Sequence, residues 1–197
     1  GEGSSPALFG DVLAVNWDHE GDSFLVVLDK HDGAERWRRP RDEVTSWSTP
    51  IVVPVDGRPQ IIIAATGKSR GYDLVTGDEL WSVPGMTVNC IPTPVHRDGT
   101  VYLMSGYQGS MLQAVRLPAA RGDLSESDHV LWRHARSTSY VPSGLLYGGC
   151  FYFVRGNSGA LSCVDAATGS VHYEGQRLRV KAIYASPVAA GGHLYFT

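Results

Sequence analysis

The sequence has few cysteines, no long apolar run and no dense cluster of positive charge, and each shortage excludes a class of protein. Only three cysteines occur in 197 residues, without a Cys-x-x-Cys pair or a Cys/His cluster, which argues against a structural zinc site. The longest apolar runs, such as IIIAA at 61–65, are far too short to span a bilayer. The net charge is −3, and no basic stripe is present, so a nucleic-acid partner is disfavoured.

Signatures of metal chemistry and of a leader are also missing. The seven histidines form no H-x-H or H-E-x-x-H arrangement, and no G-x-S-x-G nucleophile elbow occurs. The acidic stretch WDHEGDS at 17–23 offers oxygen ligands for calcium but lacks the spacing of a calcium loop, so we expect a solvated hairpin. No signal peptide is visible. The opening GEGSSP without a methionine fits either a removed leader or an internal fragment.

What the sequence does contain is a repeat. The nine residues DLVTGDELW at 73–81 recur as DKHDGAERW at 29–37 and as DAATGSVHY at 165–173. An aspartate can accept hydrogen bonds from turn amides, and glycine supplies the positive φ that a tight hairpin needs. The large aromatic ring that follows can lie against a neighbouring sheet. The repeated residues are Asp29, Gly33 and Trp37; Asp73, Thr76, Gly77 and Trp81; and Asp165, Thr168, Gly169 and Tyr173.

A second anchor sets the period. Ser-Pro or Thr-Pro occurs at 5–6, 49–50, 93–94 and 186–187, and Ser143-Gly144 stands in register with them. Successive steps from Pro6 are 44, 44, 50 and 43 residues, a period that fits a four-stranded unit better than a helix pair. The sequence therefore predicts one domain over 1–197 with units at 5–48, 49–92, 93–142 and 143–185, and a partial unit at 186–197.

Each unit reads as four short strands, and no long stretch shows helical periodicity. The second run of a unit, as in QIIIAAT, is apolar at nearly every position, so we expect both of its faces to be buried. Four-stranded antiparallel sheets that stack radially form a β-propeller. The predicted fold class is therefore all-β, a propeller with about four blades and part of a fifth.

The third unit departs from the pattern. Arg116 stands in the place of the aspartate, and the path to Trp132 is 16 residues instead of eight. We expect its polar filler, residues 119–129, to form an exposed loop.

The pattern resembles the tryptophan-docking motif A-x-D-x-x-T-G-x-x-x-W of the quinoprotein-like propellers, the family named after pyrroloquinoline quinone (PQQ). The resemblance implies that each tryptophan is held against a small first-position residue and against the glycine of an adjacent blade. It also implies a ring of seven or eight blades, so we expect an open arc, either part of a longer protein or completed by another chain. Open blade edges invite self-association. The first-position residues are Val27, Gly71, Ala114 and Cys163.

The resemblance leaves two classes of function. One is part of a dehydrogenase that oxidises an alcohol or sugar with PQQ and calcium. Such enzymes carry an adjacent Cys-Cys pair, which is absent here, and the motif aspartates already have a role in turns. The favoured class is a non-catalytic scaffold without a cofactor, because similar repeats build the lipoprotein of the bacterial β-barrel assembly machinery and secreted bacterial proteins. That resemblance implies a periplasmic or secreted location and an unidentified protein or glycan partner; no catalytic or metal-binding residue is assigned.

The loops between the second and third strands vary between units and should gather at one end of the propeller, where a partner would bind. Aromatic and arginine side chains anchor interfaces most often, so the candidate contact residues are Trp17, Arg70, Tyr107 and Arg155. Cys150 and Cys163 flank one of these loops. A disulfide between them would need the two to face each other, and two packed thiols are the favoured interpretation.

Overall fold

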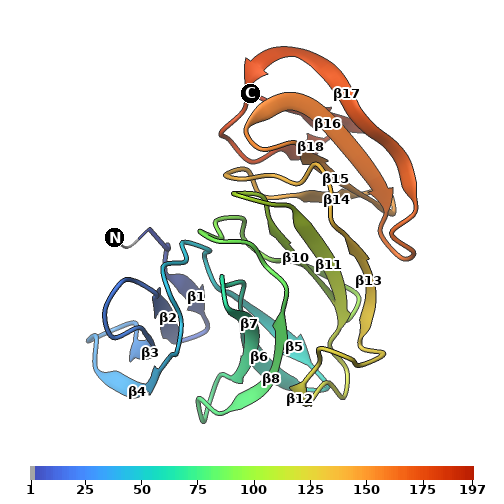
Figure 1. Cartoon of the computed structure of the whole chain (residues 1–197). Helices are drawn as coiled ribbons and strands as arrows, with labels where there is room; N and C mark the ends of the chain where they lie inside the picture. Colours follow the sequence, from blue (N-terminus) through green and yellow to red (C-terminus); the bar gives the residue numbers. More distant parts are fainter. Residues whose placement is uncertain (1–2) are drawn as a thin grey trace.

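The computed structural model describes residues 3–197, and every regular element in that part of the chain is a β-strand. The strands form four consecutive sheets, each built on four antiparallel strands, and a final two-stranded sheet. Figure 1 shows these sheets following one another along an open arc, with the N-terminal sheet and the C-terminal hairpin at its two ends. The predicted all-β propeller architecture is confirmed, and within residues 3–197 the sheets do not close into a ring.

The sheets are numbered one to five in chain order. Sheet one contains β1 (Ala7–Phe9), β2 (Val12–Trp17), β3 (Phe24–Asp29) and β4 (Glu35–Pro40), and sheet two contains β5 (Ile51–Val55), β6 (Arg58–Ile63), β7 (Lys68–Asp73) and β8 (Glu79–Pro84). Sheet three contains β9 (Val95–Arg97), β10 (Thr100–Ser105), β11 (Met111–Arg116) and β13 (Val130–His134). Sheet four contains β14 (Leu145–Tyr147), β15 (Cys150–Val154), β16 (Ser158–Asp165) and β17 (Val171–Ala182), and sheet five contains β18 (Val188–Ala190) and β19 (His193–Tyr195).

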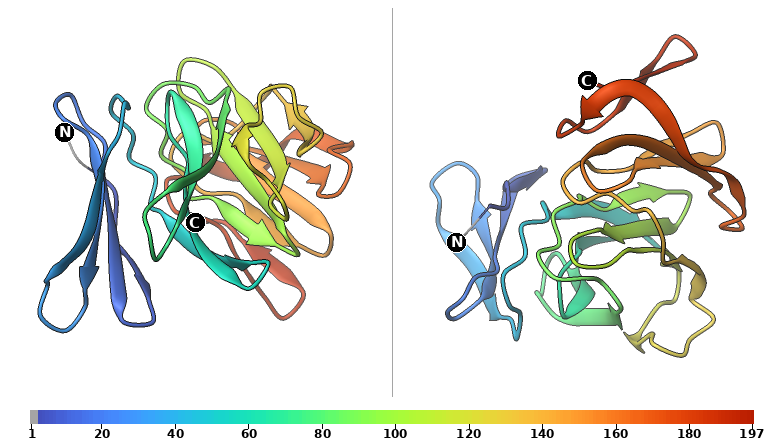
Figure 2. Two further views of the ribbon diagram at one scale, coloured as in Figure 1. Left: turned by 90° about the horizontal axis from the view of Figure 1, so that it is seen from below. Right: turned by 45° about the horizontal axis from the view of Figure 1, so that its top comes forward.

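The hydrophobic core is a series of apolar layers, one between each pair of neighbouring sheets. The apolar second strand is buried on both faces in β6 and β10, as the sequence predicts. The same expectation is wrong for β2, where buried and partly exposed residues alternate. Sheet one stands at the end of the arc, as the two views of Figure 2 show, so only one of its faces is covered. Leu8, Phe9 and Trp17 are exposed on this sheet.

The Ser/Thr-Pro anchors have a structural role that the period alone did not reveal. The backbone N–H of Ser5 donates to the hydroxyl of Thr49 at 3.3 Å. In the same way Thr93 N–H donates to Ser143 Oγ, and Ser143 N–H donates to Ser186 Oγ, each at 3.0 Å. Each bond joins one unit to the next, because the hydroxyl of an anchor satisfies an amide of the preceding anchor. The hydroxyl residue therefore links the starts of successive sheets.

Two tryptophans lie across the boundary between sheets. A Cβ added to Gly77 would lie 2.8 Å from the Trp37 ring, and one added to Gly169 would lie 2.7 Å from the Trp132 ring. The Trp37 Nε1–H donates to the carbonyl of Leu74 at 3.0 Å, and Trp132 Nε1–H donates to the carbonyl of Ala166 at 3.1 Å. A glycine is needed at both turns, because φ is positive there and the indole occupies the space of a side chain.

The third unit supplies a different cover for Trp81. The prediction that residues 119–129 form an exposed loop is wrong in part, because Ala120 and Leu124 are buried in the same cluster as Trp81. Within this segment β12 (Gly122–Asp123) pairs in parallel with β8 and becomes a fifth strand of sheet two. The Trp81 Nε1–H donates to Gln60 Oε1 at 3.0 Å within its own sheet, and its ring is fully buried. In the third unit, which lacks the Thr-Gly turn, Ala120 and Leu124 therefore cover Trp81.

The aspartates of the repeat fix their turns through hydrogen bonds. Asp73 accepts from the amides of Val75 and Thr76 at 2.8 and 2.9 Å. Asp165 accepts from the amide of Thr168 at 2.8 Å and from its hydroxyl at 2.9 Å, and these bonds lower the pKa of Asp165. The hydroxyl of Thr76 donates instead to Asp78 at 2.8 Å. The carboxylates are thus engaged in the backbone of the turn.

Replacing Trp81 by alanine should lower the free energy of unfolding by about 3–5 kcal/mol, because it removes a fully buried ring from the layer between sheets two and three. Chemical denaturation followed by circular dichroism measures the change. Trp17→Ala serves as the control, since Trp17 is 39% exposed and should cost about 1 kcal/mol or less. Equal stability of W81A and the wild-type chain would contradict this packing.

Gly77→Ala and Gly33→Ala separate the tryptophan contact from backbone strain. Both glycines have positive φ, of 73° and 75°, so each substitution carries a similar strain of about 1–2 kcal/mol. Only Gly77 faces an indole, whereas an added Cβ at Gly33 meets nothing within 4 Å. We expect G77A to lose a further 1–3 kcal/mol, roughly the cost of overpacking. Equal unfolding midpoints for the two variants would mean that the contact with Trp37 contributes nothing.

Candidate interaction surface

Because neighbouring strands are antiparallel, each loop lies at one of the two ends of its sheet. The loops that join second to third strands lie at the same end as the linkers that run from one sheet to the next, and we call this the linker end. The turns of the repeat lie at the opposite end, the turn end. All four candidate contact residues were expected on linker-end loops.

Arg70 is not available for contact, so this part of the prediction is wrong. Its side chain is only 4% exposed, and it lies in strand β7 and not in a loop. Its guanidinium forms ion pairs with Asp42, Glu43 and Glu79, the last with 3.1 Å between Nε and Oε2. The linker after β4 carries two of these carboxylates over β7. Arg70, which was predicted to be exposed, is therefore buried and pairs with the buried Glu43 and with two exposed carboxylates.

A second buried ion pair joins this linker to sheet one. Arg41 Nε and Nη2 donate to the two oxygens of Asp18 at 2.7 and 3.0 Å, and Arg41 Nη1 lies 2.5 Å from the hydroxyl of Tyr72. Burial disfavours the charge of Arg41, but the oxygens of Tyr72 and Asp18 outweigh it and raise the pKa of Arg41. Asn16 also donates to Asp18, at 3.1 Å. Asp18 was expected in a solvated loop, and the structure instead buries it.

Glu43 completes the connection to sheet two. Its oxygens accept from the amides of Gly67 and Lys68, both at 2.8 Å, and from Arg70. The carboxylate thereby closes the turn before β7 and holds the linker against it. The charged run Arg41-Asp42-Glu43 directly after β4 could have indicated these ion pairs, but its partners lie far away in the chain.

The chemistry of this network does not suit a cation. Both oxygens of Asp18 are bonded by Arg41, and both oxygens of Glu43 are occupied by amides and Arg70. In residues 3–197 there is no group of three His, Cys, Asp or Glu side chains that could hold a metal ion. Arg41 and Arg70 therefore neutralise these two carboxylates.

Tyr107 and the loop of Arg155 are brought together by the linker between sheets three and four. The Tyr107 ring stacks on Tyr140, with centroids 4.7 Å apart. The amide of Tyr140 donates to the carbonyl of Gly156 at 3.0 Å, and the amide of Gly156 donates to the carbonyl of Thr138 at 2.8 Å. The linker thus joins two of the four candidate loops.

Side chains fix the same linker from both sides. Thr138 Oγ1 donates to the carbonyl of Ser105 at 2.6 Å, and Ser139 Oγ donates to the carbonyl of Val154 at 2.9 Å. The amide of Val141 donates to Asn157 Oδ1 at 3.0 Å. These bonds attach the linker to sheets three and four, so the backbone beside the Tyr107–Tyr140 pair is fixed.

Trp17 lies apart from this group. It is on sheet one, at the other end of the arc, and stacks on Phe24 with ring centroids 6.1 Å apart. Its partial exposure belongs to the uncovered face of sheet one and not to the surface formed by Tyr107 and Arg155.

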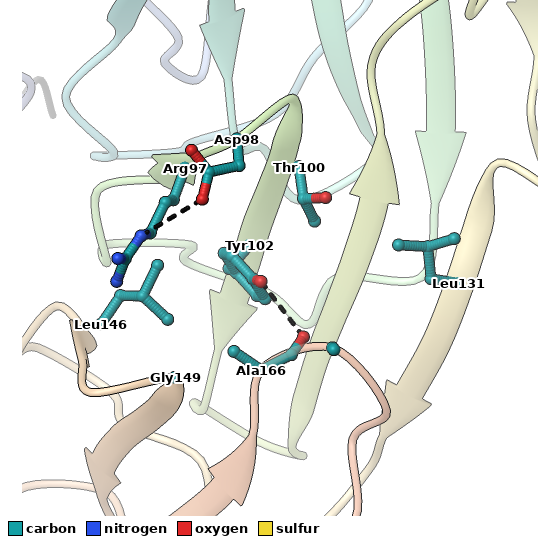
Figure 3. A pocket seen from close by; sticks show the side chains of 9 residues that line it. Arg97, Asp98, Thr100, Tyr102, Leu131, Leu146, Gly149 and Ala166 are labelled. Atoms are coloured by element: carbon teal, nitrogen blue, oxygen red, sulfur yellow. Dashed lines mark hydrogen bonds and ion pairs between the residues drawn. The ribbon is translucent and has the colours of Figure 1, made fainter.

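Two cavities lie at opposite ends of the sheets. The one at the turn end, of about 380 Å³, is bordered by Arg97, Asp98, Tyr102 and Leu146 (Figure 3). Its polar groups are already engaged: Arg97 pairs with Asp98 at 3.4 Å, and the Tyr102 hydroxyl donates to the Ala166 carbonyl at 3.1 Å. Burial raises the pKa of Tyr102, which keeps this hydroxyl protonated. The cavity at the linker end, of about 430 Å³, is bordered by Arg155 and Arg177.

The cysteines are free thiols. Cys163 lies opposite Tyr152 and Tyr173 in sheet four, while Cys150 lies opposite Asp165. Burial and the nearby Cys150 thiol raise the pKa of Cys163 to about 12. Burial likewise raises the pKa of Cys90 to about 12. Neither thiol has the low pKa of a nucleophile.

The stacked four-stranded sheets, with a glycine turn and an aromatic ring repeated between them, define a β-propeller of PQQ-like repeats. Residues 2–172 match the sequence profile of the family described as outer membrane protein assembly factor BamB, and the chain belongs to this family. No curated protein sequence matches the chain.

Solved structures share the fold. BamB from Moraxella catarrhalis matches with a TM-score of 0.63 and 16% identity, over 97% of this chain and 53% of that one. The quinohemoprotein alcohol dehydrogenase ADHIIG from Pseudomonas putida matches with a TM-score of 0.64 and 13% identity, over 100% of this chain and 38% of that one. The quinohemoprotein alcohol dehydrogenase from Comamonas testosteroni matches with a TM-score of 0.61 and 13% identity, over 100% of this chain and 39% of that one. The chain thus spans about half or less of the length of these structures.

Replacing Arg41 alone should destabilise the chain strongly. R41M leaves the Asp18 carboxylate buried without its partner, which typically costs about 3–5 kcal/mol. The matched double variant D18L/R41M removes both charges and should regain much of the loss, as apolar replacements of buried pairs often do. Denaturant unfolding of the single and double variants measures the difference. A single variant as stable as wild type would show that the pair does not hold the linker.

Proposed function

We propose that this chain is a non-catalytic β-propeller scaffold that binds a protein or glycan partner in the bacterial cell envelope. The family description, an assembly factor of the outer membrane, supports the envelope context and the scaffold function. Residues 3–197 contain no helix long and apolar enough to cross a membrane. Exposed apolar side chains on sheet one, including Leu8 and Phe9, support self-association as a further contact.

The linker end presents a pair of stacked tyrosines on a backbone that is fixed by hydrogen bonds, and this pair is the proposed contact site. Tyr107 and Tyr140 stack on each other and are only partly buried. Their backbone is fixed by bonds to sheets three and four. A rigid tyrosine pair gives a large contact area at low entropic cost, which is the property of an interface anchor.

We infer that the buried carboxylates of residues 3–197 do not form a calcium site for PQQ. The buried carboxylates Asp18 and Glu43 are neutralised by Arg41 and Arg70 and accept further hydrogen bonds. The three cysteines are not adjacent in sequence. The proposal therefore includes no cofactor, no metal and no catalytic residue among the described residues.

The alternative is that the chain forms part of a PQQ- and calcium-dependent alcohol or sugar dehydrogenase. It is favoured by the shared fold with the quinohemoprotein alcohol dehydrogenases. A fold shared at such low identity does not by itself transfer the activity.

Replacing Tyr107 and Tyr140 together by alanine should reduce capture of an envelope partner by at least about tenfold, because truncating an interface hot spot costs about 2 kcal/mol or more. Immobilised chain is exposed to solubilised envelope proteins and to cell-wall glycans, and retained material is quantified for each variant. Tyr147→Ala is the control, because Tyr147 is exposed at the turn end. Equal retention by Y107A/Y140A and wild type would contradict the assignment of the surface.

A separate experiment tests the alternative function. The longest available polypeptide containing this chain is mixed with PQQ and calcium, and its absorbance and dye-linked alcohol oxidation are recorded. We expect neither stoichiometric uptake nor turnover. Uptake with turnover would replace the scaffold proposal by the dehydrogenase.

A further inference from the structure

Positive charge gathers at the linker end of sheet four, although the whole chain has a net charge of −3. Three cations lie along β17, one in the turn before β16, and one in the linker from sheet three. All five are exposed. These residues are Arg136, Arg155, Arg177, Arg179 and Lys181, and we call them the basic cluster.

The cavity of about 430 Å³ lies within this cluster. Its border contains two guanidinium groups, of Arg155 and Arg177, and two hydroxyl residues, Ser137 and Ser158. The pairing of β16 with β17 slips at this point, because Ala160 lies opposite Arg177 while Cys163 lies opposite Tyr173. The irregularity includes Gly175, whose φ is 71°, and such bulges redirect the side chains that follow.

The local acid is already neutralised. One oxygen of Glu174 accepts from the Ser137 hydroxyl at 2.7 Å, and the other lies 3.6 Å from Arg136. In the described part of the chain, Arg155 and Arg177 form no ion pair. The cavity therefore has two uncompensated positive charges at its border, and an anion would be attracted to it.

The backbone that carries Arg155 is fixed. Its N–H donates to Ala160 and its carbonyl accepts from the amide and hydroxyl of Ser158, at 2.9, 2.9 and 2.7 Å. The next residue, Gly156, is bonded to the linker through Thr138. A fixed turn lowers the ordering cost of binding.

We propose that this cavity binds carboxylate side chains of an acidic segment of the protein partner. Arginine matches a carboxylate with two parallel hydrogen bonds, and two such groups border a space large enough for acidic side chains. Arg179 and Lys181 continue the positive charge along β17. The cavity shares the linker of the Tyr107–Tyr140 pair, so one protein partner can engage both. This inference rests on the proposed scaffold function and names the chemistry of its partner.

A protein segment fits better than a polyanion such as nucleic acid. The basic cluster is bounded by Glu174 on its own strand, and the rest of the chain is acidic in balance. A nucleic-acid surface needs a continuous basic stripe.

The alternative role of the basic cluster is to protect the edge of β17, because charged side chains on edge strands discourage strand pairing between molecules.

Fluorescence anisotropy with a labelled peptide of alternating glutamate and serine tests the proposal on the chain as it stands. We expect R155Q/R177Q to raise the Kd by at least about tenfold, because two charge-assisted contacts are lost. The charge-matched control R58Q/R97Q removes two arginines at the turn end. It should raise the Kd by no more than about twofold, because salt screens the long-range attraction of these distant charges. The same peptide with glutamine in place of glutamate should not bind measurably.

Four outcomes would overturn the proposal. The first is that the wild-type chain does not bind the peptide, and the second is an equal Kd for R155Q/R177Q and R58Q/R97Q. The third is that inorganic phosphate competes as strongly as unlabelled peptide. The fourth is that single-stranded DNA binds more tightly than the peptide. Circular dichroism confirms that each variant is folded. If the cluster only guards the edge, R155Q/R177Q and R179Q/K181Q will self-associate in light scattering while their peptide affinity stays unchanged.

These results are separable from the scaffold proposal. Unchanged peptide binding by R155Q/R177Q, with partner capture still lost in Y107A/Y140A, would remove only the cavity assignment. Cofactor uptake with turnover would remove the scaffold function itself.

Discussion

Burial of each sheet against its neighbours is the interaction on which the structure depends. A single four-stranded sheet has two faces, and water can be excluded from both only when another sheet lies on each side. Strands β6 and β10, which are buried over most of their length, have such neighbours, whereas β2 at the end of the arc does not. Hydrogen bonds between anchors and indole contacts with glycines then set the position of one sheet on the next.

The sequence predicted the features that repeat. The three motif aspartates and the five anchor positions were enough to locate the sheets, because each repeated residue has a local role in a turn or at the start of a strand. The contact of Trp37 with Gly77 also involves residues of the repeat, and a family resemblance implied it. Local patterns of this kind are readable without knowledge of the fold.

Features that occur once were not predicted, for a physical reason. The partners of Arg41 and Arg70 lie more than 20 positions away in most cases, and nothing in their immediate neighbours distinguishes a buried guanidinium from an exposed one. Residues 119–129 read as polar filler because Ala120 and Leu124 are isolated among charged residues. Their burial depends on Trp81, which lies in the preceding sheet. Of the candidate contact residues, Tyr107 and Arg155 share a linker, Arg70 is buried and Trp17 lies apart.

Strand β12 changes how the arc should respond to stress. In an array of stacked repeats, each unit contacts only its neighbours, and opening can begin at any boundary. Here a strand from the third unit belongs to the second sheet, so those two sheets cannot separate without breaking a strand pair as well as an apolar layer. The middle of the arc is thereby a single cooperative unit of unfolding, and the boundaries on either side of it are the places where local opening starts.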